Sequence, residues 1–318
     1  MSRLTEIENF VQIIEAGSMS AVSRRTGLAL SAVSRRLKEL EQRLGVTLLQ
    51  RTTRKISLTE AGHDFYLQCR QILSDLNDAE ANLSETALRL EGRIRLAAPV
   101  SFTNRYLGPL LVDFLQRYPD VALELETNDR RVDLVQDGFD LALRIGRLQD
   151  STLRARRLTR IRHLPVASPA LLERLGMPDR AEDISRYSVL QYRSTQQNNR
   201  WNFARPDGSR GAVQIKNRIV CNNGEFLTRC AEEGLGVAIE PTFIVGPAIA
   251  GGRLIPLFSD HVWSDDAVFV VYPETRALPL RVRTLIDFLV EHLDAEAPWD
   301  QEIKRQYPLY EKGWNEGI

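Results

Sequence analysis

The first 58 residues constrain the fold more than any other part of the sequence, because glycines divide them into three helix-compatible segments. Glycine ends helices readily, since it adopts the left-handed backbone conformation without strain. Two short helices joined by a turn of about three residues match the geometry of a helix-turn-helix. The predicted helices span 4–16, 20–26 and 30–44, and they are followed by Gly17-Ser18, Gly27-Leu28-Ala29 and Gly45.

The first predicted helix is amphipathic. Thr5 followed by Glu8 has the spacing of a capping box, in which each side chain satisfies a free backbone N–H at the helix start. We therefore expect this pair to begin the helix. Its apolar face, read at helical spacing, carries Leu4, Ile7, Phe10, Val11 and Ile14.

The third predicted helix separates its residues into two faces. One face is apolar and should point into a core. The other combines short hydroxyl side chains with Arg and Lys, which reach base edges and phosphates, so it is typical of a recognition helix. A solvated basic surface helix is the alternative interpretation. The apolar face holds Val33, Leu37, Leu40 and Leu44, and the polar face holds Ser31, Ser34, Arg35 and Lys38, with Arg36 beside them.

A basic hairpin should follow the three helices. Residues 46–58 alternate as two short strands around Thr52-Thr53-Arg54-Lys55, the pattern of a wing. Arg51, Arg54 and Lys55 would meet phosphate or the minor groove. Residues 1–58 also hold ten Lys and Arg against five Glu, whereas the whole chain has a formal net charge of zero. This uneven charge indicates local binding to a polyanion such as double-stranded DNA.

A long helix should come next, from Thr59 to about Leu90, because this stretch holds no proline and only Gly62 near its start. Its apolar residues form a stripe too narrow for a core helix, so we expect it to pair with a second copy of the chain. Packing on the chain's own C-terminal domain is the alternative. The stripe consists of Phe65, Cys69, Ile72, Leu76, Ala79 and Leu83.

After Gly92 the pattern changes to alternating strands and helices, which predicts an α/β domain with a largely parallel sheet. The predicted strands span 94–98, 121–125, 141–145, 164–167, 188–192, 213–220, 236–239 and 267–272. The predicted helices span 104–117, 132–135, 169–175, 224–233 and 279–293.

The order and spacing of short motifs over nearly the whole chain resemble those of the LysR-type regulators. The chain departs from the family at Thr26, which is polar at a core position, and at Leu30, where Gln or Pro is common. Departures also occur at Met19, Val22, Ser23 and Leu49. The matching motifs are Phe10-Val11, Ala16-Gly17-Ser18, Ser31-Ala32-Val33-Ser34, Leu40-Glu41, Leu44-Gly45, Leu48, Arg51, Leu58-Thr59-Glu60-Ala61-Gly62, Phe114, Tyr118-Pro119, Asp133-Leu134-Val135, Gly138-Phe139-Asp140-Leu141-Ala142 and Gly234-Leu235-Gly236-Val237.

The resemblance implies a DNA-binding transcriptional regulator controlled by a small molecule. Its expected parts are a winged helix-turn-helix (1–58), a dimerising linker helix (59–91), a two-lobed α/β effector domain like the periplasmic solute-binding proteins (92–294) and a C-terminal extension (295–318). Lobe I should comprise 92–162 and 268–294, and lobe II 163–267, with strands crossing near Leu164 and Phe269. The expected partners are promoter DNA, an effector, a second copy of the chain in a dimer or dimer of dimers, and RNA polymerase.

The effector should bind between the lobes, where strands hand over to helices. Ser101 and Thr103 follow a strand and begin a helix, and free N–H groups and the helix dipole favour an anion there. Simple helix capping is the alternative. We expect an anionic effector, because hydroxyls and Arg144 gather at this edge and acidic side chains are few. Arg144 could equally pair with Asp140 or Glu126. The remaining candidates at the edge are Val100, Asn128, Gly146, Asn222 and Asn223.

Other kinds of site find little support. Cys69, Cys221 and Cys230 are too few and scattered for a disulfide framework or zinc site, and we interpret the last two as core residues, not redox switches. The four histidines lack metal-ligand spacing, so neither metal nor cofactor is expected. Nor does the chain show a nucleophile with a base, which argues against an enzyme on a two-lobed scaffold.

A solute-binding protein of a transporter would share the two-lobed scaffold. The basic helix-turn-helix and the lack of a signal peptide or membrane span argue against it, so we expect a cytoplasmic protein. The C-terminal extension mixes aromatic and acidic residues, with Trp299, Tyr307, Tyr310 and Trp314 among them. An arm that docks on a neighbouring subunit and a loosely ordered tail are both compatible with this composition.

Overall fold

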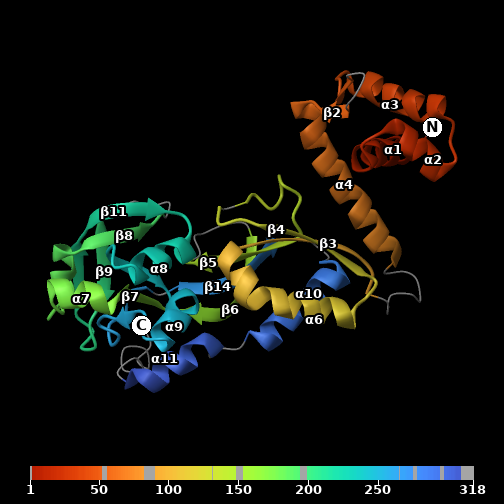
Figure 1. Ribbon diagram of the computed structural model, residues 1–318. Coiled ribbons are helices and arrows are strands. Elements are labelled where there is room, and N and C mark those ends of the chain that lie inside the picture. Colours follow the sequence, from red (N-terminus) through yellow and green to blue (C-terminus); the bar gives the residue numbers. More distant parts are fainter. Residues whose placement is uncertain are drawn as a thin grey trace.

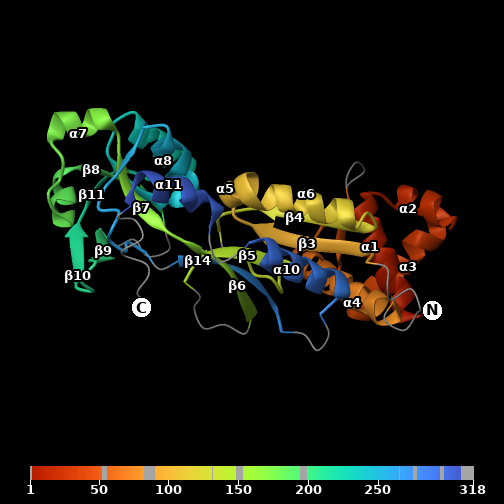
Figure 2. The same ribbon diagram turned by 90° about the horizontal axis from the view of Figure 1, so that it is seen from below.

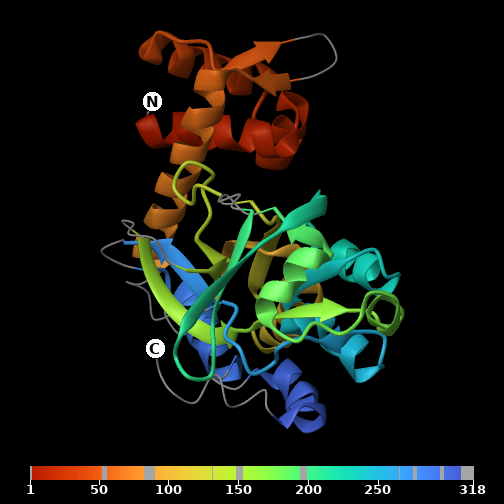
Figure 3. The ribbon, with the colours of Figure 1, turned by 90° about the vertical axis from the view of Figure 1, so that its left-hand side faces the viewer.

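The chain forms a small N-terminal unit, a connecting helix and two α/β lobes that lie side by side (Figure 1). The N-terminal unit stands at one end, joined to the lobes through the connecting helix α4 (Figure 3). The structure is a computed structural model that describes residues 2–51, 56–81, 90–130, 132–147, 153–193, 199–264, 266–274, 278–293 and 297–308.

The N-terminal unit begins with three helices, as the glycine pattern predicts. Gly17, Gly27 and Gly45 all adopt positive φ angles at the helix ends. The capping-box prediction is wrong, however, because the first helix begins before Thr5 and its N-cap is Ser2, whose hydroxyl accepts from the Leu4 N–H. The elements are α1 (Arg3–Ala16), α2 (Met19–Thr26), α3 (Leu30–Leu44), β1 (Leu49–Arg51) and β2 (Ile56–Leu58), and the last two pair antiparallel.

The core of this unit lies between α1, α3 and the start of α4 (Glu60–Ala81). Val33, Leu37 and Leu40 are fully buried, but Leu44, also predicted to be buried, is 37% exposed because it ends α3 beyond the core. Gly62 lies so close to β1 that a Cβ atom would stand 2.0 Å from the Leu48 carbonyl oxygen.

The apolar stripe of α4 packs partly on its own N-terminal unit. Cys69 is buried in that core, and Phe65 lies against Phe10 with ring centroids 5.6 Å apart. The prediction that the whole stripe meets a second copy is therefore wrong for its first half. Ile72 is 52% exposed and remains available to a partner. The predicted continuation to Leu90, including Leu83, falls largely outside the described residues, as does the side chain of Ala79.

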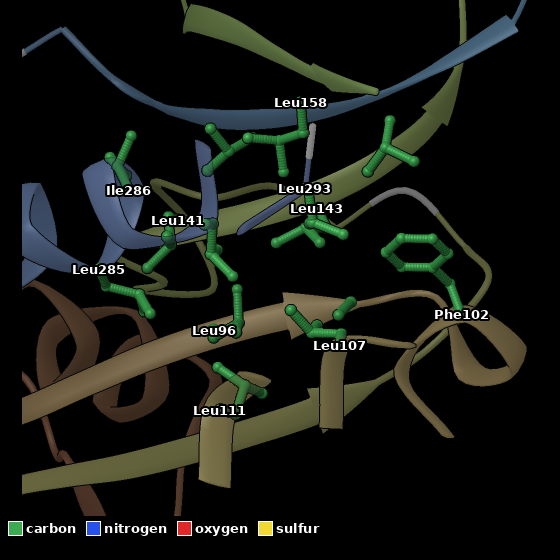
Figure 4. Close-up of a cluster of buried hydrophobic side chains, with 14 of the residues drawn as sticks. Leu96, Phe102, Leu107, Leu111, Leu141, Leu143, Leu158, Leu285, Ile286 and Leu293 are labelled. Atoms are coloured by element: carbon green, nitrogen blue, oxygen red, sulfur yellow. The ribbon is translucent and has the colours of Figure 1, made fainter. Parts of the chain in front are cut away.

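Lobe I is a five-stranded sheet covered on one face by helices, and its core is shown in Figure 4. The strand order is β4-β3-β5-β14-β6; the first three strands are parallel, and β14 runs antiparallel to both β5 and β6. The elements are β3 (Gly92–Ala98), α5 (Val100–Phe102), η2 (Thr103–Leu107), α6 (Gly108–Arg117), β4 (Val121–Thr127), β5 (Leu141–Gly146), β6 (Leu153–Ile161), β14 (Asp266–Pro273) and α10 (Leu280–His292).

Lobe II is a second five-stranded sheet with the order β11-β8-β12-β7-β13, and it carries a β9–β10 hairpin. Helices α8 and α9 cover one face, and α7, η3 and the hairpin cover the other. The elements are β7 (His163–Ala167), α7 (Pro169–Leu175), η3 (Ala181–Arg186), β8 (Ser188–Tyr192), β9 (Arg200–Ala204), β10 (Arg210–Gln214), β11 (Lys216–Cys221), α8 (Gly224–Glu232), β12 (Val237–Pro241), α9 (Thr242–Ala250) and β13 (Ile255–Pro256).

Three details of the predicted α/β domain are wrong. Both sheets are mixed, not largely parallel, because strands entering from the other lobe pair antiparallel. The predicted strand 213–220 is two strands in different sheets, with a break at Ile215. The predicted helix 132–135 is a turn, because the Asp133 carboxylate accepts from the N–H groups of Val135 and Gln136 and replaces helical hydrogen bonds.

The C-terminal extension docks on its own chain through what we call the arm, residues 297–308 (Figure 2). It comprises η4 (Pro298–Asp300) and α11 (Gln301–Gln306). The Trp299 ring lies 4.5 Å from Tyr106 of lobe I, and Ile303 is buried in the core of lobe II. Asp300 lies 3.6 Å from the guanidinium of Arg162, the residue at which the chain crosses between the lobes. The arm therefore contacts both lobes.

Candidate functional site

The polar face of α3 is the candidate DNA-binding surface. Ser31, Arg35 and Lys38 are exposed, and Ser34 and Arg36 are partly exposed. Arg35 points into solvent, with 67% of its side chain exposed and only a loose pair to Glu39 at 3.6 Å. The N-cap residue Ala29 supplies no side-chain hydrogen bond, so the first N–H groups of α3 stay available to phosphate oxygens.

Buried polar contacts hold α3 at a fixed angle, and the sequence analysis did not find them. The Asn9 amide donates to the Val33 carbonyl oxygen at 3.1 Å inside the core. The Arg43 guanidinium donates two hydrogen bonds to Glu6, at 2.9 and 2.8 Å. Glu6 and Asn9 lie three residues apart on α1, beside its apolar stripe, and that spacing was the available signal.

The predicted wing is only partly described. Strands β1 and β2 pair with Arg51 opposite Ile56, and the Glu41 carboxylate accepts from the Leu48 N–H at 2.8 Å, which ties β1 to α3. The tip with Arg54 and Lys55, and the side chain of Arg51, lie outside the described residues. Their contact with DNA stays a prediction.

The candidate effector site lies where β3 ends. Pro99 leads directly into a continuous helical segment that begins at Val100. Ser101 and Thr103 are 9% and 5% exposed, and the Thr103 hydroxyl has no hydrogen-bond partner among the described residues. Asn128 and Gly146 lie at the same edge, because the parallel strands β3, β4 and β5 end there.

Two of the predicted effector ligands have structural roles in turns. The Asn128 side chain accepts from the Arg130 N–H at 2.8 Å. The Val100 N–H donates to Asp129 at 3.1 Å, so a carboxylate already occupies one of the helix-start donors. Burial raises the pKa of Asp129, while the hydrogen bond from Val100 acts in the opposite direction. Sequence analysis overlooked Asp129, although it directly follows the predicted ligand Asn128.

Arg144 makes one backbone contact away from Ser101. It shares a sheet face with Ala142, which packs with Leu134, whereas Phe102 packs in the core on the other face. Its guanidinium donates to the Val132 carbonyl oxygen at 3.0 Å. This bond to Val132 directs part of the Arg144 guanidinium to its own lobe, and the predicted convergence of Arg144 with the two hydroxyls stays a prediction.

Of the two predicted effector ligands in lobe II, one caps a helix and the other is exposed. Asn223 caps α8 by accepting from the Phe226 N–H at 2.8 Å, whereas Asn222 is exposed. Gly146 of lobe I has a φ of +133°, a backbone conformation that side chains rarely adopt. These positions explain local backbone geometry, and none of them carries a charge toward a ligand.

Glu240 is the polar residue of lobe II that the sequence analysis missed. It is fully buried on β12, and neither carboxyl oxygen has a hydrogen-bond partner among the described residues. Burial raises the pKa of Glu240 well above its usual 4.5, because the protein interior disfavours the charged carboxylate. A Cβ atom on Gly224 would lie 2.5 Å from its Oε2 atom, which explains the glycine there.

A partly buried residue, Tyr192, lies near Glu240 at the end of β8. Burial, followed by the charges of Asp129 and Glu240, raises the pKa of Tyr192 to about 12. The field of Asp129, from lobe I, thus reaches a residue of lobe II. The expectation that acidic side chains are few in this region is wrong, since Asp129 and Glu240 both lie there.

Direct contacts join the two lobes beside these groups. The Phe102 and Phe243 rings meet edge to face at 5.5 Å, next to the Trp299 ring of the arm. The Arg105 side chain pairs with Glu225 at the start of α8, at 3.1 Å. Ser101 and Thr103 therefore lie at a closed junction between the lobes.

The structure also bears on the cysteines, on metal binding and on membrane spans. Cys230 packs with Leu227 in the lobe II core, as predicted, and burial raises the pKa of its thiol. Among the described residues, no three His, Cys, Asp or Glu side chains are grouped as a metal site. Within those ranges, no helix has the length and apolar character needed to span a membrane.

Known proteins resemble the chain over both of its parts. The family model described as "Bacterial regulatory helix-turn-helix protein, lysR family" matches residues 4–63, and the one described as "LysR substrate binding domain" matches residues 88–294. The regulator CrgA of Neisseria meningitidis serogroup C is 36% identical over 289 residues, which cover 91% of this chain and 96% of CrgA.

Solved structures agree with this result. The N. meningitidis CrgA structure aligns with a TM-score of 0.56 at 34% identity, covering 92% of this chain and 99% of that one. The full-length structure of AphB, a virulence activator of Vibrio cholerae, aligns with a TM-score of 0.57 at 27% identity and covers 92% of this chain and all of that one. The chain therefore belongs to the LysR-type family of DNA-binding transcriptional regulators, with an N-terminal helix-turn-helix and a C-terminal effector-binding domain.

Proposed function

We propose that this regulator binds promoter DNA through α3 and the wing, and that an anionic small molecule bound between lobes I and II controls this binding. The observation that carries the effector site is the pair Ser101 and Thr103, buried at the lobe junction with one hydroxyl unpartnered. Buried hydroxyls are normally hydrogen-bonded, so an unpartnered one at a junction favours an absent ligand.

The chemistry of the junction favours an acceptor-rich ligand. Ser101 and Thr103 each offer a hydroxyl donor, and burial of Glu240 favours its protonated carboxyl, a further donor that brings no negative charge. Asp129 limits the site, because it already occupies the Val100 N–H. The carboxylate of an effector would therefore be met by hydroxyl groups and not by that backbone donor.

On the DNA side, the proposed base and phosphate contacts are Ser31, Ser34, Arg35, Arg36 and Lys38 of α3, together with Arg51, Arg54 and Lys55 of the wing. Their positive charge and hydroxyl donors are suited to a polyanion with acceptor-rich base edges. Two copies would join through the exposed side of α4, with Ile72 on it, and a dimer of dimers would bind paired half-sites. Since it would act on promoters, we place the regulator in the cytoplasm. Contact with RNA polymerase there is a further proposal.

The effector site can be tested on the full chain with matched ligands. A panel of metabolite carboxylates and their amides is screened by thermal shift, and we expect a carboxylate to raise Tm where its amide does not. The double variant Ser101→Ala, Thr103→Ala should weaken that ligand by ~1–2 kcal/mol for each lost charge-assisted hydrogen bond.

The matched control is Thr284→Ala on α10, where the hydroxyl donates to the Leu280 carbonyl oxygen within the helix. It should leave the ligand-induced shift intact. DNA binding without effector should stay normal in all variants, because α3 is untouched. A normal effector response in the Ser101, Thr103 double variant would refute the lobe junction as the binding site.

A further inference from the structure

Leu30 is a large apolar residue exposed at the start of α3. It is the first residue of the helix and is 48% exposed, whereas Val33 and Leu37 are fully buried. Leu28, just before it, packs against the core of the N-terminal unit. The fold therefore does not use the Leu30 side chain to build this core.

The residues around Leu30 indicate that its exposed side chain has a function. Ser31 and Arg35 are exposed on the same first turns of α3, and Ser34 is partly exposed between them. A single exposed leucine is ordinary on a protein surface, so its exposure alone means little. Its position matters more, since the N-terminal residues of the second helix in a helix-turn-helix approach the edges of the bases.

An aliphatic side chain can read only one feature of the major groove. Leucine neither donates nor accepts a hydrogen bond, so it cannot recognise the nitrogen and oxygen atoms of the base edges. The apolar group displayed there is the 5-methyl of thymine. Beside donors that suit phosphates and guanine, Leu30 supplies the complementary apolar contact.

We propose that Leu30 selects a thymine in the bound DNA by packing against its 5-methyl group. This inference rests on the proposed recognition role of α3 and adds the base that its first residue reads. Removal of that methyl group should weaken binding about fourfold for each contacted thymine, the usual effect of one buried methyl-sized group.

The test uses the full chain and replaces thymine by deoxyuridine, which removes the methyl group and leaves the hydrogen-bonding edge intact. Preferred DNA is first selected from a random-sequence pool, and each thymine is then replaced in turn. The wild-type chain should lose about fourfold in affinity at one thymine of each half-site. Leu30→Ala should bind the thymine and deoxyuridine forms equally.

Leu44→Ala is the matched control, because Leu44 ends the same helix and is also partly exposed. It should keep the wild-type sensitivity to the methyl group. Each measurement compares two DNAs on one variant, so a change in folding stability cancels. Leu30→Ile, which keeps an apolar contact, should restore part of the discrimination.

The other outcomes separate this inference from the assignment of α3. If no thymine is methyl-sensitive in the wild-type chain, or if Leu30→Ala keeps the sensitivity while Arg35→Ala changes the selected sequence, Leu30 does not read thymine although α3 still reads DNA. If neither Leu30→Ala nor Arg35→Ala changes the selected sequence, the recognition role of α3 fails as well.

Discussion

The DNA-binding face of α3 and the lobe junction hold their functional side chains in opposite ways. On α3 the side chains proposed to meet DNA are exposed, and the polar contacts that orient the helix, such as Asn9 with Val33, are buried beneath. At the junction the side chains proposed to meet an effector, such as Thr103 and Glu240, are themselves buried, and neither side chain has a hydrogen-bond partner among the described residues. A large polyanion needs an open surface, whereas a small molecule is recognised by enclosing it.

Removal of the Trp299 ring should have the largest effect, and only on the lobes. Trp299→Ala takes away a ring that contacts Phe102 and Tyr106 at the junction. Deletion of such a buried aromatic typically costs about 3–5 kcal/mol. Thermal unfolding should show the lobes destabilised while the N-terminal unit keeps its helical signal. Leu175→Ala, at an exposed leucine of lobe II, is the control and should change Tm little.

Gly62→Ala should instead destabilise the N-terminal unit and leave the lobes folded. The new methyl group would meet the backbone of Leu48 at 2.0 Å, and overpacking of this kind costs about 1–3 kcal/mol. DNA binding should weaken, because α4 and β1 must separate, while the effector-induced thermal shift persists. Gly246→Ala in α9 is the matched control, since its nearest neighbour would be 3.6 Å away. Equal DNA binding by both variants would contradict the close packing of α4 on β1.

Arg35→Ala tests the exposed site directly. If Arg35 reads a base edge, its loss should cost ~1–3 kcal/mol on selected DNA and little on random DNA. Arg283→Ala is a close control, because Arg283 is also exposed and pairs with Asp287 four residues along its helix. Similar losses on selected and random DNA would instead assign Arg35 to a phosphate. Arg54→Ala in the wing should act in that second way and lower the salt slope by about one.

Glu240→Gln should have the smallest effect and a distinctive pH dependence. The pKa of Glu240 is raised in the folded chain, so the ionised unfolded chain is favoured increasingly as pH rises above the usual 4.5. Near pH 4.5 the variant and wild type should unfold alike, and toward neutral pH the variant should be the more stable. Denaturant unfolding at several pH values measures this.

The sequence predicts the helices of the N-terminal unit better than it predicts which surfaces pack together. Helices α1 to α3 follow from apolar spacing and glycine stops, because these signals are local. The stripe on α4 was predicted correctly as a stripe, but spacing does not reveal which surface covers it, and Phe65 lies on its own unit. Strand β6 was missed because five of its nine residues are polar or charged, LRARRLTRI.

The lobe junction was harder to predict than the DNA-binding face for the same physical reason. Ser101 and Thr103 were identified from a strand-to-helix transition, which is a local feature. The bond from Arg144 to the Val132 carbonyl oxygen was not predicted, because the direction of this side chain depends on which sheet face packs against which segment. Glu240 had a readable signal, an acid inside the apolar strand Val237–Pro241, where burial without a partner is costly.

The arm changes the mechanics of the two lobes. The chain crosses between them at Arg162 and again just before β14, and two such neighbouring crossings form a hinge. Asp300 pairs with Arg162 at that hinge. The Trp299 ring packs against Tyr106 of lobe I and Phe243 of lobe II, and Ile303 lies in the core of lobe II. Two connecting strands alone leave the lobes free to move about the hinge. A segment that contacts both lobes must first detach from one of them. Residues 297–308 therefore add to the free energy needed to part the lobes, beside the strands that connect them.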